Sequence, residues 1–445
     1  MKIIFTLLLL LILIYLSTCD ALKEKSNPGL PNIIFIISDD QGWTDYGFMN
    51  HPAIKTPHID RLANKGITYT RGYVTAPLCS PSLASMITGI YPHQHGITGN
   101  DPEFSTESER YSLEWLVDRK EPMDTLIEQF KENPLLTGIL AEHGYLSFQT
   151  GKWWLGSYRD GGFDYGMTHG IPEKGGRHGD NGLEIGRQGM DTLYRFVELA
   201  IEKKQPFFIW YAPFLPHAPH DPPDSLLNKY LKTTSSESLA RYMANCEWFD
   251  VTVGQLLNHL EEKNLTDKTM ILFVCDNGWA QDPERPNRYL EGSKRAPYDL
   301  GIRTPMIISW PGRIESLRDT LTLVSSIDLV PTVLHALEIP QPGSLQGISL
   351  LERSRLKERD RIFSEVFYHD IKNIRDPVPG LKYRILIKDS WKLIIPDDRN
   401  LPDNKSELYD VLKDPFEDHN LVEELPGLAG ELKKEIDDWW KPGFE

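Results

Sequence analysis

The sequence predicts an α/β fold in which helices flank a large, mainly parallel sheet. Two observations support this prediction: short runs of consecutive apolar residues, and helical patterns between them. Strands of a parallel sheet are covered on both faces, so they appear as unbroken hydrophobic runs. Their alternation with helices indicates βαβ units. We expect strands at Pro31–Ser38, Pro206–Tyr211, Thr269–Cys275 and Thr304–Trp310, and helices at Asp191–Lys203 and Ser238–Lys263.

The chain changes character at Pro340–Ser349, which is rich in Pro, Gly and Ser. Beyond it, short strand-like runs at Tyr383–Ile387 and Trp391–Ile395 predict a smaller C-terminal α+β subdomain. We therefore expect a main α/β domain over residues 26–345 and the subdomain over residues 346–445.

The N-terminus has the layout of a secretory signal peptide, predicted over residues 1–19. Lys2 supplies the positive end, and Ile3–Leu16 is apolar apart from one threonine. The run is short for a membrane span, so we expect a secreted, periplasmic or cell-surface protein. Cys19 is a candidate lipid anchor, with plain cleavage as the alternative. An odd number of cysteines then remains, so at least one is a free thiol or a modified residue: Cys79, Cys246 and Cys275.

The charge of the chain excludes one class of function. Sixty-four acidic residues against 48 basic ones give a net charge of -16. Nucleic-acid binding requires clustered Lys and Arg, so we expect no nucleic-acid partner. A small anionic substrate remains compatible, because a few cations in a cleft outweigh a distant, screened surface charge.

Two acidic pairs follow predicted strands. Asp39 and Asp40 come directly after the first strand, and Asp276 and Asn277 follow the third. Sites in open α/β sheets form beyond the carboxyl ends of the strands. Four oxygen donors suit Ca²⁺ or Mg²⁺, and carboxylates with an amide oxygen favour Ca²⁺. The alternative is that these residues are ordinary turn residues.

Cys79 is predicted at the N-terminus of a helix. Ser80 suits the N-cap and Pro81 the first helical position. Free N–H groups there stabilise negative charge on a nucleophile. The alternative is a buried structural cysteine.

These residues resemble the sulfatase family, within the alkaline phosphatase superfamily. The family signature Cys-x-Pro-Ser-Arg, which runs on to Thr-Gly, resembles CSPSLASMITG at Cys79–Gly89. Similar family motifs cover nearly the whole mature chain in the same order: NIIFIISDDQGW at Asn32, TGKWWLG at Thr150, PHAP at Pro216, CDNG at Cys275, GSKRAPYDLGIRTPMIISWPG at Gly292, SIDLVPTVLHAL at Ser326 and ELYDVLKDPFEDHNL at Glu407.

The resemblance implies a sulfuric ester hydrolase with an alkaline phosphatase-like sheet. In the family, a formylglycine-generating maturation enzyme converts the signature cysteine to formylglycine (3-oxoalanine), whose hydrate attacks the sulfur of a sulfate ester. By resemblance, Cys79 is the precursor and a metal ligand, and the two acidic pairs hold one Ca²⁺ that polarises the sulfate. The residues expected around the sulfate are Lys152, His217 and Lys294.

Two positions depart from the family pattern. Leu83 stands where the signature has Arg, and Trp154 stands where the Lys-Trp-His motif has His. Leu can neither donate hydrogen bonds nor carry charge. Three hypotheses follow: an active sulfatase with a matured Cys79, a hydrolase that uses an unmodified Cys79 thiolate, and a non-catalytic, calcium-holding carbohydrate-binding protein. The candidates to replace the missing imidazole are His93, His95, His169, His178 and His220.

The expected partner is an extracellular sulfated saccharide or another sulfate ester. Aromatic side chains near the predicted site are candidates to stack on sugar rings, with plain packing as the alternative. These side chains are Trp153, Trp154, Tyr158 and Trp279.

Overall fold

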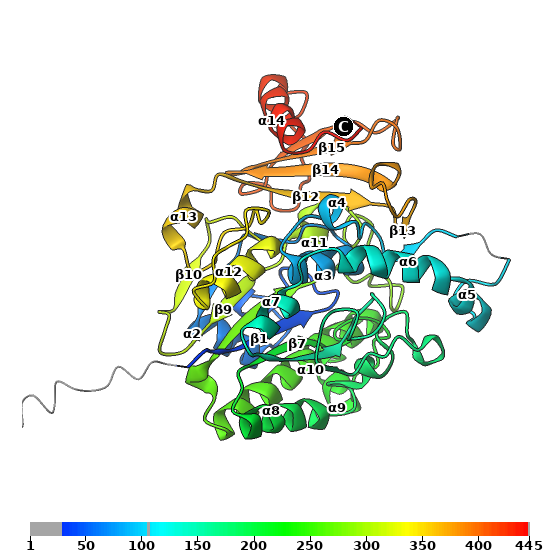
Figure 1. The fold of residues 1–445 in the computed structure, drawn as a ribbon. Helices are drawn as coiled ribbons and strands as arrows, with labels where there is room; N and C mark the ends of the chain where they lie inside the picture. Colours follow the sequence, from blue (N-terminus) through cyan, green and yellow to red (C-terminus); the bar gives the residue numbers. More distant parts are fainter. Residues whose placement is uncertain (1–28, 105–106, 444–445) are drawn as a thin grey trace, which may run out of the picture. The chain divides into compact units, whose positions relative to one another are not determined.

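The computed structural model describes residues 29–104 and 107–443 (Figure 1). The predicted signal peptide and Cys19 lie outside the described residues. None of the helices in the described part has the length and apolar character that crossing a membrane requires. Residues Asn32–Glu445 form one compact unit, so the division at residues 345 and 346 stays a prediction.

An eight-stranded sheet forms the centre of this unit, in the order β10-β2-β9-β8-β1-β7-β5-β6. Strand β1 pairs in parallel with both of its neighbours, β7 and β8. Strand β9 runs antiparallel to β8 and β2, so the sheet is mainly, not wholly, parallel. The predicted strands appear as β1 (Asn32–Ser38), β7 (Phe207–Ala212), β8 (Thr269–Cys275) and β9 (Met306–Ser309), and β5 spans Leu146–Gly151.

Both faces of the sheet are covered, which explains the unbroken apolar runs. Along β1, Ile33, Phe35 and Ile37 pack into one hydrophobic cluster, while Ile34 and Ile36 pack into another. Because side chains alternate across a strand, a strand between two helical layers must be apolar at every position. Figure 1 shows α8 and α10 on one side of the sheet and α3 and α12 on the other. The bounds are α3 Cys79–Thr88, α8 Asp191–Lys203, α10 Glu237–Glu262 and α12 Leu329–Ala336.

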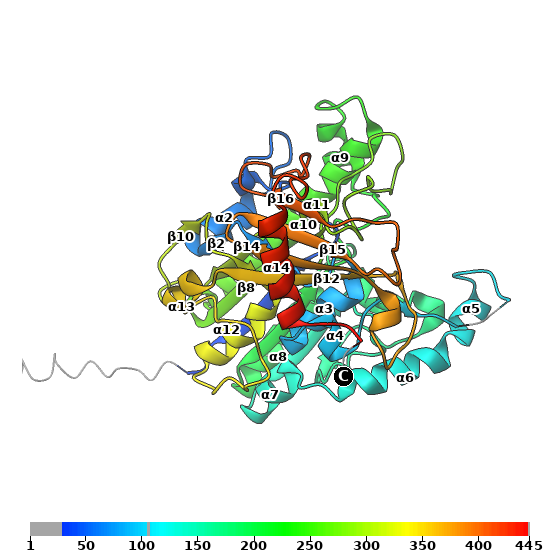
Figure 2. The same ribbon diagram turned by 90° about the horizontal axis from the view of Figure 1, so that it is seen from above.

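The C-terminal part is an antiparallel sheet in the order β12-β14-β15-β16, which confirms the predicted subdomain type. Helix α14 packs on it through Leu432 and Ile436, which join a hydrophobic cluster with Leu386 and Leu393. Figure 2 shows α14 crossing these strands. The bounds are β12 Arg361–Phe367, β14 Leu381–Lys388, β15 Trp391–Pro396, β16 Glu407–Asp410 and α14 Pro426–Trp439.

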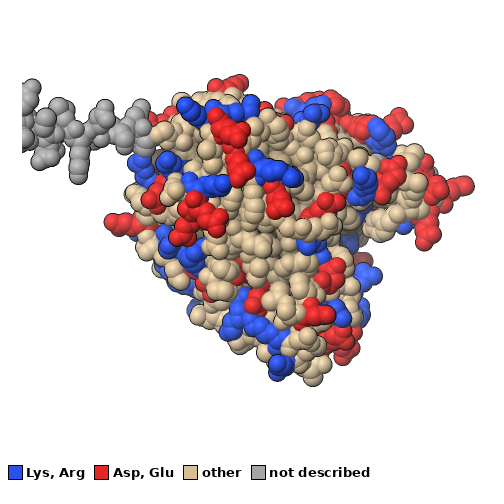
Figure 3. Space-filling view, turned by 90° about the horizontal axis from the view of Figure 1, so that it is seen from below, with Lys and Arg blue, Asp and Glu red and all other residues tan. Residues whose placement is uncertain are grey.

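The surface carries charges of both signs. Figure 3 shows basic and acidic side chains interspersed over the face seen from below. The remaining helices are α2 Pro57–Lys65, α4 Pro92–His95, α5 Leu113–Asp118, α6 Lys120–Lys131, α7 Leu136–Glu142, α9 Asp224–Tyr230, α11 Asp299–Ile302 and α13 Arg353–Glu358. The remaining strands are β2 Ile67–Tyr69, β3 Gly72–Tyr73, β4 Asp101–Pro102, β6 Tyr165–Gly166, β10 Leu317–Asp319, β11 Val324–Ser325 and β13 Asp370–Ile371.

Candidate active site

The two acidic pairs meet at the carboxyl ends of β1 and β8. Ser38, the last residue of β1, is in register with Cys275, the last residue of β8, so the residues that follow are neighbours. The backbone N–H of Asp40 donates to Asp276 Oδ1 at 3.1 Å. The Asn277 amide donates through Nδ2 to Asp40 Oδ1 at 2.7 Å. These side chains are buried, so their charges require partners.

Cys79 is the first residue of α3, and its sulfur faces the acidic pairs. The Cys79 Sγ atom lies 3.5 Å from Asn277 Oδ1. The prediction that Ser80 caps the helix was wrong by two residues: Leu78 is the N-cap because its backbone is extended and its carbonyl accepts from Ser82 N. Burial raises the pKa of the Cys79 thiol to about 11, although two lysines oppose the shift. Like Cys246 and Cys275, Cys79 forms no disulfide within the residues that the structure describes.

Lys152 and Lys294 reach this cluster from opposite sides. Lys152 follows β5, and its Nζ lies 3.0 Å from Cys79 Sγ, 3.2 Å from Asp276 Oδ2 and within hydrogen-bonding distance of Asp39 Oδ1. Lys294 Nζ lies 2.6 and 2.7 Å from the two oxygens of Asp40 and 3.3 Å from Cys79 Sγ. Burial opposes charge on both lysines, but the carboxylates hold their pKa values above the usual range.

The charge and donor set of the cluster fit a divalent cation. With all three carboxylates ionised, they and the two ammonium groups leave a net charge of -1 beside a neutral thiol, although burial raises the pKa of Asp39 well above its usual value. Asp39 Oδ2 is buried without a hydrogen-bond partner. One oxygen from each of the three carboxylates and Cys79 Sγ lie within 4.8 Å of one another. Because buried unpaired carboxylate oxygens are costly and hard cations prefer oxygen, the site suits a hard divalent cation such as Ca²⁺ or Mg²⁺.

His217 lies beside Asp40, in the loop after β7. Its Nδ1 faces the carbonyl oxygen of Ala218, which can only accept, so Nδ1 carries the proton. Its Nε2 lies 3.4 Å from Asp40 Oδ2. Burial, with Lys152 and Lys294, lowers the pKa of His217 well below its ordinary value.

Arg177 and His178 also belong to the site, although the sequence did not single out Arg177. The His178 ring lies 4.7 Å from the Trp154 ring and 6.1 Å from the His217 ring. Arg177 donates to His178 Nε2 at 2.8 Å, and its guanidinium lies 4.5 Å from the centre of the Trp154 ring. Since Nε2 accepts, the proton of neutral His178 resides on Nδ1.

The other candidate histidines have other neighbours. His93 pairs with Glu365 and stacks on Trp440, and His95 contacts Ser85 within the helical layer. His169 packs against a tyrosine ring, and His220 packs between Tyr242 and Trp279. Among the five histidines raised from the sequence, His178 is the one that packs on both Trp154 and His217.

The residues that depart from the family pattern are buried. Leu83 lies one turn after Cys79 and packs into the hydrophobic core. Trp154 is 3% exposed beneath Arg177. The four aromatic residues considered for sugar stacking are all buried, which favours the packing interpretation for Trp153, Trp154, Tyr158 and Trp279.

Comparison with known proteins gives the same family. A family model described as Sulfatase matches residues 31–339, and a model described as N-sulphoglucosamine sulphohydrolase, C-terminal, matches residues 291–440. The chain is 28% identical to human N-acetylgalactosamine-6-sulfatase over 77% of its own length and 69% of that protein. It is 25% identical to N-acetylgalactosamine-6-O-sulfatase of Bacteroides thetaiotaomicron over 94% of its length and 95% of that protein.

A solved structure shows the same fold. The crystal structure of Ps i-CgsB superposes with a TM-score of 0.72 at 23% identity, covering 92% of this chain and 93% of that one. The first family model spans well over half of the chain and includes both acidic pairs, Cys79 and both site lysines. The chain therefore belongs to the sulfatase family of sulfuric ester hydrolases.

Proposed function

We propose that this protein is a calcium-dependent sulfatase that removes sulfate from an extracellular sulfated saccharide, with a formylglycine derived from Cys79 as its nucleophile. One observation carries the proposal: Lys152 Nζ, Lys294 Nζ and Asn277 Oδ1 all lie within 3.5 Å of Cys79 Sγ. A cysteine that only packs in the core would not require two buried ammonium groups beside its sulfur. The side chain at position 79 is thus the focus of the site.

The charge balance gives the site its preference for an anion. A formylglycine at position 79 would supply the hydrated nucleophile, and a bound Ca²⁺ would polarise the sulfate. The proposed ligands are Asp39, Asp40, Asp276, Asn277 and the group at position 79. A dication changes the charge of the cluster from -1 to +1, which complements a sulfate ester.

Lys152 and Lys294 are proposed to stabilise the charge that develops on the sulfate oxygens and the leaving oxygen. Both ammonium groups are buried and already in position, so little reorganisation is needed as the reaction proceeds. Each also neutralises carboxylates that would otherwise repel an anionic substrate.

We assign proton donation to His217 and hydrogen-bond donation to His178. With Nδ1 held by the Ala218 carbonyl, His217 is proposed to donate Nε2–H to the leaving oxygen once the bound sulfate, an anion, raises its lowered pKa. His178 is proposed to replace the imidazole that Trp154 displaces. Arg177 fixes its tautomer, so that Nδ1–H is the free donor.

The substrate class rests on the relatives. The two enzymes named above act, by their names, on the 6-sulfate of N-acetylgalactosamine. We therefore propose a sulfated saccharide as the substrate. Export through residues 1–19 to the periplasm, the cell surface or the medium, with Cys19 as a candidate lipid anchor, completes the proposal.

Leu83 favours a second candidate, a hydrolase or calcium-holding binding protein with an unmodified Cys79. Its apolar, buried side chain cannot hydrogen-bond to the group at position 79 or carry the charge that the family signature supplies. This alternative differs from the first in the covalent state of one residue.

The mass of the tryptic peptide Gly72–Arg110, from protein made in its native host, tests the proposal. Loss of sulfur and gain of oxygen at Cys79 supports formylglycine. Aryl sulfate hydrolysis above that of Cys79→Ala then establishes turnover. An unmodified cysteine would overturn the formylglycine mechanism.

A further inference from the structure

A cavity of about 260 Å³ is lined by three basic and two acidic side chains, and one of the basic ones, Arg295, is the residue after Lys294. Two chain segments connect it to Cys79. Arg295, on the wall, directly follows Lys294 and donates its backbone N–H to Pro77 O at 2.9 Å. His369, also on the wall, lies with its Nε2 3.4 Å from Asn100 Nδ2. Asn100 in turn accepts through Oδ1 from the backbone N–H of Ser80 at 3.0 Å.

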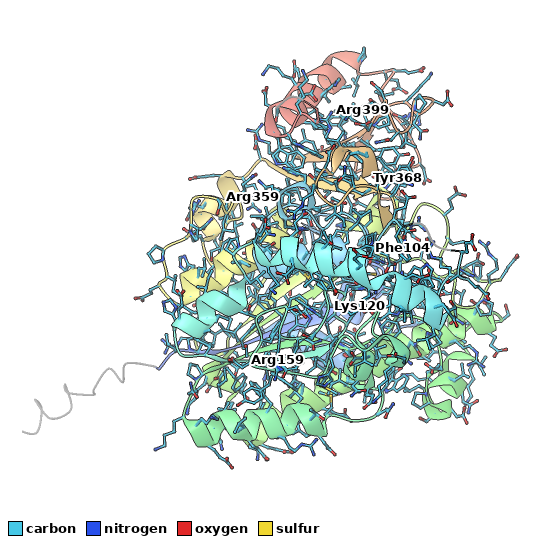
Figure 4. The ribbon with its side chains drawn as sticks, turned by 45° about the vertical axis from the view of Figure 1, so that its right-hand side comes forward. Phe104, Lys120, Arg159, Arg359, Tyr368 and Arg399 are labelled. Atoms are coloured by element: carbon cyan, nitrogen blue, oxygen red, sulfur yellow. The ribbon has the colours of Figure 1, made fainter. Side chains whose placement is uncertain are left out.

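The C-terminal part supplies one wall of this cavity. Strand β13 pairs with β4, with Asp370 opposite Asp101. This pairing places Tyr368 and His369 beside the segment that contains β4 and follows α3. Figure 4 labels Tyr368 and Phe104 from the two segments on the same side of the molecule.

Positive charge is in excess around the cavity. Arg110 pairs with Asp370 at 3.0 Å, and Lys372 pairs with Glu103 at 2.6 Å. Arg295 and the nearby Lys382 form no ion pair with any carboxylate that the structure describes. Two unpaired cations therefore lie together, in a chain whose net charge is -16.

The pKa of Lys382 reflects repulsion between these two cations. Burial, with Arg295 adding to it, lowers the pKa of Lys382. Lys382 and Lys372 lie 5.8 and 5.5 Å from the centre of the Tyr368 ring, so the ring is flanked by two ammonium groups. Adjacent like charges without a counterion are unfavourable, and an anionic ligand would relieve them.

A bound metal ion does not account for the charged side chains around this cavity. Asp101, His369 and Asp370 lie close enough to share an ion, but Arg119 occupies one oxygen of Asp101 at 2.6 Å. Arg177 occupies the other oxygen, also at 2.6 Å. The carboxylate is thus satisfied by two guanidinium groups, which leave further positive charge at the cavity.

We infer that this cavity is a subsite for a second anionic group on the sulfated saccharide, a uronate carboxylate or a second sulfate, with Arg295 on its wall as the ligand and Lys382, 5.8 Å from the centre of the Tyr368 ring, as a second cation. The inference rests on the proposed sulfatase function. Arg presents a planar fork that matches carboxylate and sulfate oxygens. Tyr111, also on the wall, is 56% exposed, and the guanidinium groups of Arg110 and Arg177 lie 5.2 and 4.8 Å from its ring centre.

Three matched substrates test the subsite: a disaccharide with one sulfate, the same disaccharide with an added uronate carboxylate, and the same with a second sulfate. Arg295→Gln and Lys382→Gln are each expected to raise KM about tenfold for the substrate whose second anion the subsite binds, with kcat unchanged. Arg295→Lys should restore part of the loss. Arg313→Gln, at an exposed arginine outside the cavity, is the matched control. Which of the two doubly anionic substrates responds identifies the anion.

Binding to Cys79→Ala, measured by calorimetry, separates this inference from the proposed function. In that background Arg295→Gln should weaken the affinity for the doubly anionic disaccharide about tenfold and leave that for the singly sulfated one unchanged. Equal loss for both disaccharides, or no loss for either doubly anionic one, would overturn the subsite. A wild type that binds in this pattern without turnover would reject the catalytic proposal alone.

Discussion

The Nζ atom of Lys152 lies 3.0 Å from the Sγ atom of Cys79 while the same ammonium group contacts Asp39 and Asp276. Lys152 thereby links the proposed nucleophile precursor to the carboxylates of the proposed metal site. Both side chains are buried, so neither contact is weakened by solvent.

Lys294→Ala should reduce kcat/KM for an aryl sulfate at least about a hundredfold, because an in-place cation is lost from the reacting sulfate. Arg295→Gln, one residue along the chain, should leave aryl sulfate hydrolysis within about twofold, because this substrate has no second anion. Steady-state kinetics on the two variants make the comparison. Equal losses would place Lys294 outside the sulfate site.

Ca²⁺ should stabilise the fold. A free Ca²⁺ concentration one hundred times the Kd adds about 2.7 kcal/mol to the free energy of unfolding. The midpoint of thermal unfolding should therefore rise with Ca²⁺ and fall after chelation. Asp276→Asn should lose this response, whereas Asp267→Asn, near the opposite end of β8, should keep it. A midpoint that is indifferent to Ca²⁺ in the wild type would contradict the metal site.

His178→Phe should lower kcat about a hundredfold with little change in KM, because the ring that packs on Trp154 is kept and its nitrogen atoms are lost. His169→Phe is the control, since His169 packs against Tyr158 instead. Stopped assays at saturating substrate measure kcat directly. A full kcat in His178→Phe would mean that the hydrogen bond from the imidazole has no part in the reaction.

Asp250 should make stability fall as pH rises. It accepts backbone hydrogen bonds from His58 and Ile59 at the start of α2, but burial raises its pKa to about 7. An unfolded aspartate has a pKa of about 4. The folded protein thus holds a proton that the unfolded chain releases, and the resulting stability is lost between about pH 4 and pH 7.

Denaturant unfolding at about pH 5 and about pH 8 checks the sign of this effect. The free energy of unfolding of Asp250→Asn should depend less on pH over this range than that of the wild type. Parallel pH profiles for the two proteins would show that Asp250 does not titrate as described.

Much of the framework follows from the sequence for physical reasons. Continuous apolar runs identify β1, β7 and β8 because both faces of the sheet are covered. The sequence also predicts that Asp39 lies near Asp276, because neighbouring parallel strands end at the same edge of the sheet. The antiparallel direction of β9 could not be predicted from the sequence, since a buried strand has the same composition in either direction.

The remaining site residues were harder to predict from the sequence. Lys152 and Lys294 were expected through family motifs alone, because an isolated lysine is usually exposed. Arg177 lies in a stretch without periodicity, and its place beside Trp154 depends on tertiary packing. The start of α3 at Cys79 reflects the extended backbone of Leu78, which outweighed the capping preference of Ser80.

The pairing of β13 with β4 brings residues of the C-terminal part to the cavity that Arg295 lines, so the proposed selectivity draws on two stretches of the polypeptide. Cys79, its carboxylates, its lysines and Arg295 all precede residue 300, whereas Tyr368, His369 and Lys382 come from the C-terminal part. Substitutions in the later stretch can therefore change which molecules are accepted while the bond-breaking groups stay in place. Such a division would let a lineage explore new sulfated polymers without first rebuilding its chemistry.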